Sequence, residues 1–139
     1  FIWKRYFWED VEDKKDEENG NKLLSFVNVI YSLTEFMLFL KRLYADKLEV
    51  ETVHIEIKLD DCSGRKLASF DFFVHLWNYV SGEDSITIKK DLQTSALKAS
   101  AKDVAKDFIK QIFMLFNWND PQEQTIEGWQ TKLLERGGF

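Results

Sequence analysis

Residues 23–40 form the most apolar stretch of the chain, and this stretch limits the fold more than any other feature. It reads LLSFVNVIYSLTEFMLFL, which is long enough to raise the question of a membrane span. Asn28 and Glu35 lie inside it, and a carboxylate in the middle of a bilayer is costly. We therefore expect a helix that belongs to the core of a soluble protein.

The spacing of polar residues predicts that this helix covers residues 22–46, with Asn21 as its N-cap. Polar residues recur at three-, four- and seven-residue steps, and they are Ser25, Asn28, Ser32, Glu35 and Arg42. Apolar residues fill the broad opposite face, and they are Phe26, Val29, Ile30, Leu33, Phe36, Met37, Leu40 and Leu43. So wide an apolar face predicts burial on more than one side. Phe39 is the exception, an aromatic residue on the polar stripe.

The middle of the chain predicts a three-stranded antiparallel meander. Residues 53–59 alternate strictly between apolar and polar side chains, which is typical of a strand with one buried face. We expect a second strand at about 66–78 and a third at about 85–90, because turn-forming residues separate them. A weaker alternation in residues 1–8 indicates an additional N-terminal strand.

The remaining segments complete a single α+β domain over residues 1–139. Residues 9–22 are charged and contain Gly and Asn, so we expect a loop. Ser100 and Asp103 resemble a capping box for a helix that ends near Asn117. Asp120 and Pro121 predict the start of a final helix that runs to about Arg136. Because the chain begins with Phe rather than Met, we expect a domain taken from a longer protein or a processed product.

Charge and cysteine content narrow the class of protein. The net charge is −5, whereas nucleic-acid modules need a clustered basic surface, so direct nucleic-acid binding is not expected. The single cysteine, Cys62, cannot form an internal disulfide, and this favours a reducing, cytoplasmic setting. Hydrophobic residues make up 45% of the chain, enough to fill a core.

No pattern indicates a catalytic, cofactor or metal site. Glu56 and Lys58 match the Glu-x-Lys pair of metal-dependent nucleases, but a long helix occupies the place of the Asp that such enzymes also need. Strand alternation alone predicts both residues on a solvent face. Two histidines and Cys62 give no zinc spacing, although a pairing of Cys62 with His54 or His75 stays open. Gly64-Arg65-Lys66 reads as an exposed hairpin tip with two cations.

The surplus of aromatic residues has two explanations, and burial under the three predicted helices is favoured over contact with another protein. The second face of the predicted middle strand carries Ser69, Asp71, Phe73, His75 and Trp77. Phe73 and Trp77 are too apolar for a plain solvent face. Either helices cover both faces of the sheet, or these rings form a contact patch. We take Phe39, Phe73, His75 and Trp77 as the candidate interaction surface.

Three short sequence segments of the chain are similar to segments found in one protein family. They are Arg42-Leu43-Tyr44, residues 53–59 leading to Gly64-Arg65-Lys66-Leu67, and residues 104–116 closing with Phe116-Asn117-Trp118. Across residues 22–118, the order of elements resembles the C-terminal region of bacterial proteins that carry a Schlafen-type AlbA-like domain at the N-terminus. The nucleic-acid or nucleotide chemistry of that family belongs to its N-terminal domain. The resemblance therefore implies an accessory domain without catalytic residues of its own.

The sequence thus favours a non-catalytic accessory or protein-interaction domain of a larger bacterial protein. Its partners would be other domains of the parent chain or a separate protein, including a second copy in a homodimer. The alternative is a ligand-sensing or nucleic-acid-processing enzyme domain with a pocket near the middle strand, using Glu56, Lys58 or His75. A cleft with convergent polar side chains would favour the enzyme, whereas an apolar patch would favour the interaction domain.

Overall fold

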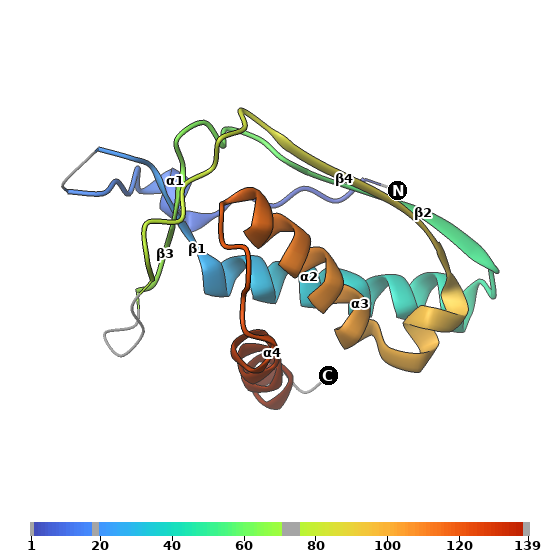
Figure 1. Cartoon of the computed structure of the whole chain (residues 1–139). Coiled ribbons are helices and arrows are strands. Elements are labelled where there is room, and N and C mark those ends of the chain that lie inside the picture. The colour runs from blue at the N-terminus through green and yellow to red at the C-terminus, as the bar shows by residue number, and fades with distance from the viewer. Residues whose placement is uncertain (1, 18–19, 71–75, 138–139) are drawn as a thin grey trace.

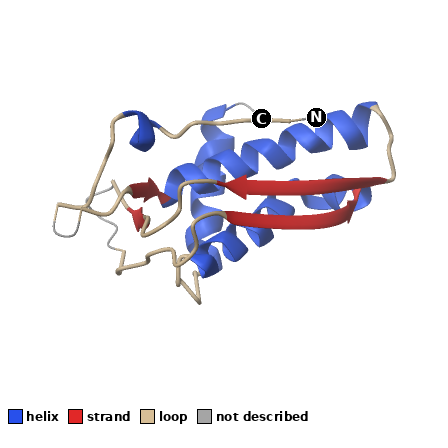
Figure 2. Cartoon of the chain, turned by 90° about the horizontal axis from the view of Figure 1, so that it is seen from above, coloured by secondary structure: helices blue, strands red, loops and turns tan. Residues whose placement is uncertain are grey.

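The computed structural model describes residues 2–17, 20–70 and 76–137, and it has an α+β arrangement (Figure 1). An antiparallel ribbon of two strands lies over a layer of helices, and a small second sheet lies at one end (Figure 2). The elements, in chain order, are α1 (Trp8–Val11), β1 (Leu23–Ser25), α2 (Phe26–Leu40), the π-helix η1 (Lys41–Lys47), β2 (Thr52–Leu59), β3 (Lys66–Ala68), β4 (Ile86–Gln93), α3 (Thr94–Leu115) and α4 (Glu123–Gly137). In the described part of the chain, every helix is too short or too polar to cross a membrane.

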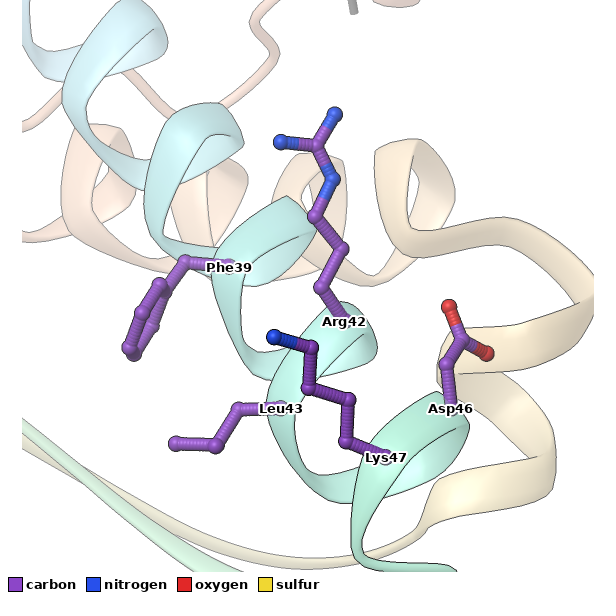
Figure 3. A pocket seen from close by; sticks show the side chains of 5 residues that line it. All are labelled: Phe39, Arg42, Leu43, Asp46 and Lys47. Carbon is purple, nitrogen blue, oxygen red and sulfur yellow. The ribbon is translucent and has the colours of Figure 1, made fainter.

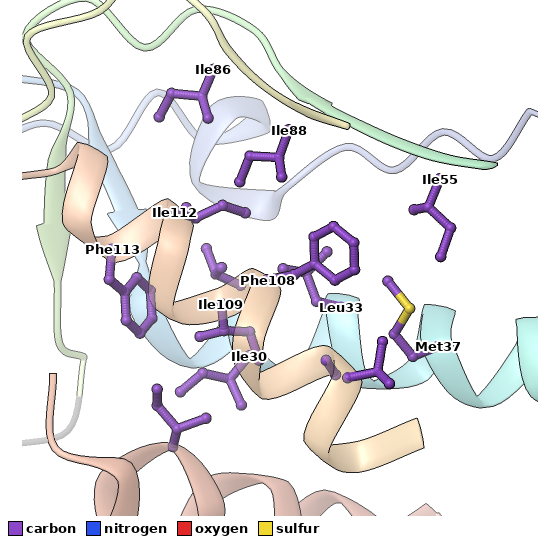
Figure 4. Packing of buried hydrophobic residues seen from close by; sticks show 14 of the residues in the cluster. Ile30, Leu33, Met37, Ile55, Ile86, Ile88, Phe108, Ile109, Ile112 and Phe113 are labelled. Atoms are coloured by element: carbon purple, nitrogen blue, oxygen red, sulfur yellow. The ribbon is translucent and has the colours of Figure 1, made fainter. Parts of the chain in front are cut away.

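The ribbon consists of β2 and β4, in a register that runs from Thr52 opposite Gln93 to Leu59 opposite Ile86. Both predicted strands are confirmed, and β4 extends past the predicted end at residue 90. Apolar side chains on the inner face of the ribbon are buried against the helices, and they are Val53, Ile55, Ile86, Ile88 and Leu92. Figure 4 shows Ile55 above Met37 of α2, and Ile88 above the ring of Phe108 of α3. The ribbon and the two long helices therefore share one core.

The predicted meander is wrong, because the first and third predicted strands pair directly with each other. In the described part of the predicted middle strand, residues 66–70 and 76–78, the only strand is β3, which pairs in parallel with β1 in the second sheet. Val80 adds an isolated bridge to Lys66, and residues 71–75 lie outside the described residues. Alternation of side chains identifies a strand and its buried face, but it does not identify the neighbouring strand.

The first long helix begins later than predicted. Residues 23–25 form β1, and Ser25 rather than Asn21 is the N-cap, since its Oγ accepts a hydrogen bond from the backbone N–H of Asn28 at 3.2 Å. From Lys41 the helix continues as η1 and ends at Lys47, one residue past the predicted end. The chain thus enters the helix directly from a strand.

The N-terminal segment, residues 2–11, covers the polar stripe of α2. The predicted strand at residues 1–8 is absent from the described residues 2–7, and the predicted loop at 9–22 overlaps α1. Arg5 pairs with Glu35 at 2.7 Å, and Glu9 Oε1 accepts hydrogen bonds from the Ser25 backbone N–H at 2.6 Å and from Asn28 Nδ2 at 3.0 Å. Sequence periodicity predicts that the polar stripe of α2 faces solvent. In the structure, this stripe instead binds the N-terminal segment.

The two C-terminal helices are joined to α2 by buried polar contacts. Ser100 has extended backbone angles that divide α3, and its Oγ accepts from the Asp103 N–H at 3.2 Å, which confirms the predicted cap. Gln130 of α4 is fully buried and donates to Thr34 Oγ1 at 3.1 Å and to the Lys102 carbonyl at 2.9 Å. One amide therefore connects three helices.

Candidate interaction surface

Two adjoining hollows lie along the outer flank of α2 and η1, and they share Phe39. One has a volume of about 380 Å³ and is lined by Phe39, Arg42, Leu43, Asp46 and Lys47 (Figure 3). The other has a volume of about 240 Å³ and is lined by Trp3, Glu35, Phe36 and Phe39. We call this continuous depression the Phe39 groove. The surface that lines it is mostly apolar.

The shape of the groove follows from the local sequence. Phe39, Leu43 and Lys47 recur at four-residue intervals, and Figure 3 shows Phe39 and Leu43 projecting to one side of the helix while Arg42 and Asp46 lie on the other. The π-helix widens the turn at this point, and such turns are frequent at functional sites. Trp3 reaches the groove from the N-terminal segment and stacks on Phe36 with ring centroids 5.3 Å apart.

The groove exposes large apolar side chains in a setting with a local excess of positive charge. Trp3 and Phe39 are 41% and 40% exposed, and a pair of rings held this open is typical of a binding surface. Arg42 and Lys47 line the η1 end of the groove with Asp46 as the one acid there, although the whole chain carries a net charge of −5. This end therefore favours a partner with negative charge.

The structure separates the residues of the predicted interaction surface. Phe39 lies in the groove, whereas Trp77 is 80% exposed in the segment after β3, where the Tyr79 carbonyl accepts a hydrogen bond from the Leu67 N–H. β3 pairs with β1 at the start of α2, whereas Phe39 lies near the other end of α2, so Trp77 and Phe39 belong to opposite ends of this helix. Phe73 and His75 lie outside the described residues. Within the described structure, Phe39 and Trp77 are therefore both exposed, but on separate surfaces.

The residues considered for nuclease chemistry lie on the outer face of the ribbon, as alternation predicts. Glu56 is 3.9 Å from Lys89, and Lys58 is 3.1 Å from Asp60. His54 Nδ1 contacts Asp91 at 2.6 Å across the ribbon. The residues that the structure describes contain no group of three or more His, Cys, Asp and Glu that could hold a metal ion. These contacts are those of a solvated cross-strand surface.

The predicted exposed tip at Gly64-Arg65-Lys66 is wrong, because Arg65 is 1% exposed. Its guanidinium pairs with Asp10 at 2.7 Å and donates to the Leu23 carbonyl at 3.3 Å. Lys66 pairs with Asp16 at 3.2 Å. The turn-forming residues in the sequence do not show that the N-terminal segment folds over this turn. Arg65 and Lys66 are therefore held in ion pairs within the chain.

Cys62 is buried beside this turn and should be chemically inert. Its thiol donates to the Leu59 carbonyl at 3.3 Å, and burial raises the pKa of Cys62 to about 11. Because the thiolate is the reactive form, we expect the folded protein to react with an aromatic disulfide reagent at pH 8 at least roughly a hundredfold more slowly than the urea-unfolded chain. Absorbance of the released thiolate measures both rates. Equal rates would contradict the buried position of this side chain.

Comparisons with protein-family models, curated proteins and solved structures find no match to this chain. The resemblance of residues 22–118 to the C-terminal region of Schlafen-type AlbA-like domain proteins therefore stays a prediction.

Proposed function

We propose that this chain is a non-catalytic protein-interaction module that binds an apolar segment of a partner in the Phe39 groove. The observation that carries the proposal is the continuous surface of Trp3, Phe36, Phe39 and Leu43, hollowed along one helix flank. Helical grooves of this kind bind peptides through a few apolar anchors, and exposed rings supply most of the binding energy.

The charges at the groove define the chemistry of that partner. Glu35 is already paired with Arg5, so its charge is compensated within the chain. The residues that line the η1 end are Arg42, Asp46 and Lys47, so this lining carries two positive charges and one negative charge. A peptide with apolar anchors and acidic residues beside them complements this arrangement, and its affinity should fall as salt screens the charges.

This role agrees with the context expected from the sequence. An accessory domain of a larger bacterial, cytoplasmic protein would bind other domains of its parent chain or a separate protein, including a second copy. The proposal does not include direct nucleic-acid binding, because Arg42 and Lys47 are the only cations among the residues that line the groove. The alternative, a ligand-sensing or nucleic-acid-processing enzyme, has less support, since Glu56 and Lys58 lie in cross-strand pairs on a solvated face.

Selection of short random peptides on the immobilised protein tests the proposal. We expect the selected peptides to combine Phe, Trp, Leu or Ile with Asp or Glu. Phe39→Ala should weaken their binding about tenfold or more, because it removes the ring shared by both hollows. Calorimetric titration of the best peptide measures the change.

Leu115→Ala is the matched control, since Leu115 is 39% exposed on α3 and lies outside the groove. Its affinity for the same peptide should equal that of the wild type. The proposal fails if the selected peptides bind the Phe39→Ala variant as tightly as the wild type, or if they are enriched in Lys and Arg.

A further inference from the structure

The outer edge of β2 is a second surface with the features of an interface. Within the described residues, β4 is the only strand that pairs with β2, so the opposite edge of β2 has no neighbouring strand. Among the described residues, β4 likewise pairs with no strand other than β2. An open edge presents backbone N–H and C=O groups that another strand can pair with. The side chains of the two edges differ, and they decide which edge accepts a strand.

The strand β4 carries an inward-pointing lysine, which hinders the addition of a further strand at its outer edge. Lys90 lies on the inner face of the ribbon between Ile88 and Leu92, with its Nζ 5.9 Å from the centre of the Phe108 ring. An inward-pointing lysine protects a sheet edge, because a strand added there would bury the charge. β2 has no such residue, since its inner positions are Val53, Ile55, Ile57 and Leu59. The last two are only half-buried and leave apolar surface for a further strand to cover.

The outer face of β2 is complementary to itself. When two copies of β2 run antiparallel about Ile57, Glu56 lies opposite Lys58 of the partner subunit, and the two-fold axis generates the same pair again. Opposite charges at directly opposed positions stabilise a sheet. The same register places Ile55 opposite Leu59 of the partner subunit on the inner face. In one chain, Glu56 and Lys58 form solvent-exposed pairs with Lys89 and Asp60 of the described residues, so both can also reach a second strand.

We propose that a second copy of this chain pairs with β2 in this register, which joins two ribbons into one four-stranded antiparallel sheet. The contact is isologous, as in most homodimers. The inference extends the proposed interaction role to a second surface and uses no residue that lines the Phe39 groove. Its partner is defined by the Glu56 and Lys58 charges and by the apolar inner positions of β2.

Charge reversal tests the inference by sedimentation of the full chain over a range of concentrations. The wild type should form a dimer as concentration rises. Glu56→Lys and Lys58→Glu should each weaken the dimer about tenfold or more, because the symmetry turns two attractive pairs into two repulsive ones. The double variant E56K/K58E should recover the wild-type dimer, since the opposed charges are again complementary. Circular dichroism of each variant verifies that the chain is folded.

Asp107→Lys is the control, because it makes the same change of charge as Glu56→Lys at an exposed position of α3. It should leave the dimer unchanged. A wild type that stays monomeric at every concentration overturns the inference, as does a double variant that is no better than the single ones. If Phe39→Ala abolishes the dimer while both single reversals keep it, the dimer uses the groove, and the β2 inference fails while the proposed function stands.

Discussion

Phe26→Ala should lower the free energy of unfolding by about 4 kcal/mol, because it removes the ring at the centre of the aromatic core. Phe26 is fully buried at the first position of α2. Its ring meets Trp118 and Trp129 edge-on, with centroids 6.2 Å and 6.1 Å apart. Trp118 also stacks on Phe113 at 5.0 Å, so the cavity would open where α2, α3 and the segment before α4 meet.

Urea denaturation of Phe26→Ala and Phe39→Ala provides a matched comparison of one substitution at a buried and a half-exposed ring. The Phe39 variant should lose less than about 1 kcal/mol, because its ring is already 40% exposed. Similar losses for both variants would contradict the assignment of Phe26 to the core and of Phe39 to a surface. A folded Phe39→Ala variant is also what the binding experiment needs.

Asp10→Ala should cost about 3 kcal/mol, and this is the second large effect that we expect. Arg65 is almost completely buried, and Asp10 is the carboxylate that compensates its charge. The Nε atom of Arg65 has no hydrogen-bond partner among the described residues, so few other polar contacts stabilise the guanidinium. Removing Asp10 would leave a buried cation unpaired, which costs more than removing the cation itself.

A double-mutant cycle with Arg65→Met measures this asymmetry. Arg65→Met should cost about 1 kcal/mol, because Asp10 is partly exposed and can be hydrated, and the methionine refills the space. The double variant should resemble Arg65→Met alone, since no uncompensated charge remains. Additive losses would show that the two side chains do not act as a pair. Glu12→Ala is the control, because Glu12 pairs with Lys14 in solvent and should contribute little.

The sequence predicts the elements of this fold better than their arrangement. Alternation in residues 53–59 is a local property, and β2 is therefore found at the expected place. The pairing of β2 with β4 depends on the course of the intervening residues, which local patterns do not contain. The predicted start of α2 is too early because Leu23 and Leu24 suit the apolar face of a helix as well as a buried strand, and it is the pairing with β3 that makes residues 23–25 a strand.

The candidate surface was predicted in part for the same reason. Phe39 could be recognised because a ring on a polar stripe breaks the expected pattern. Phe36 and Leu43 fit the apolar face of the helix and were assigned to the core, although both are only partly buried. Trp3 is distant in sequence, and its stacking on Phe36 depends on how the N-terminal segment folds back over α2.

The most direct test of the interaction surface is a titration of the ¹⁵N-labelled protein with the selected acidic, apolar peptide. We predict amide shift changes concentrated at Phe36, Phe39 and Leu43, with the indole signal of Trp3 also moving. These changes should be lost in Phe39→Ala and retained in Leu115→Ala. Changes centred on Trp77 and Tyr79, with the groove signals unmoved, would contradict the proposal that the Phe39 groove is the binding site.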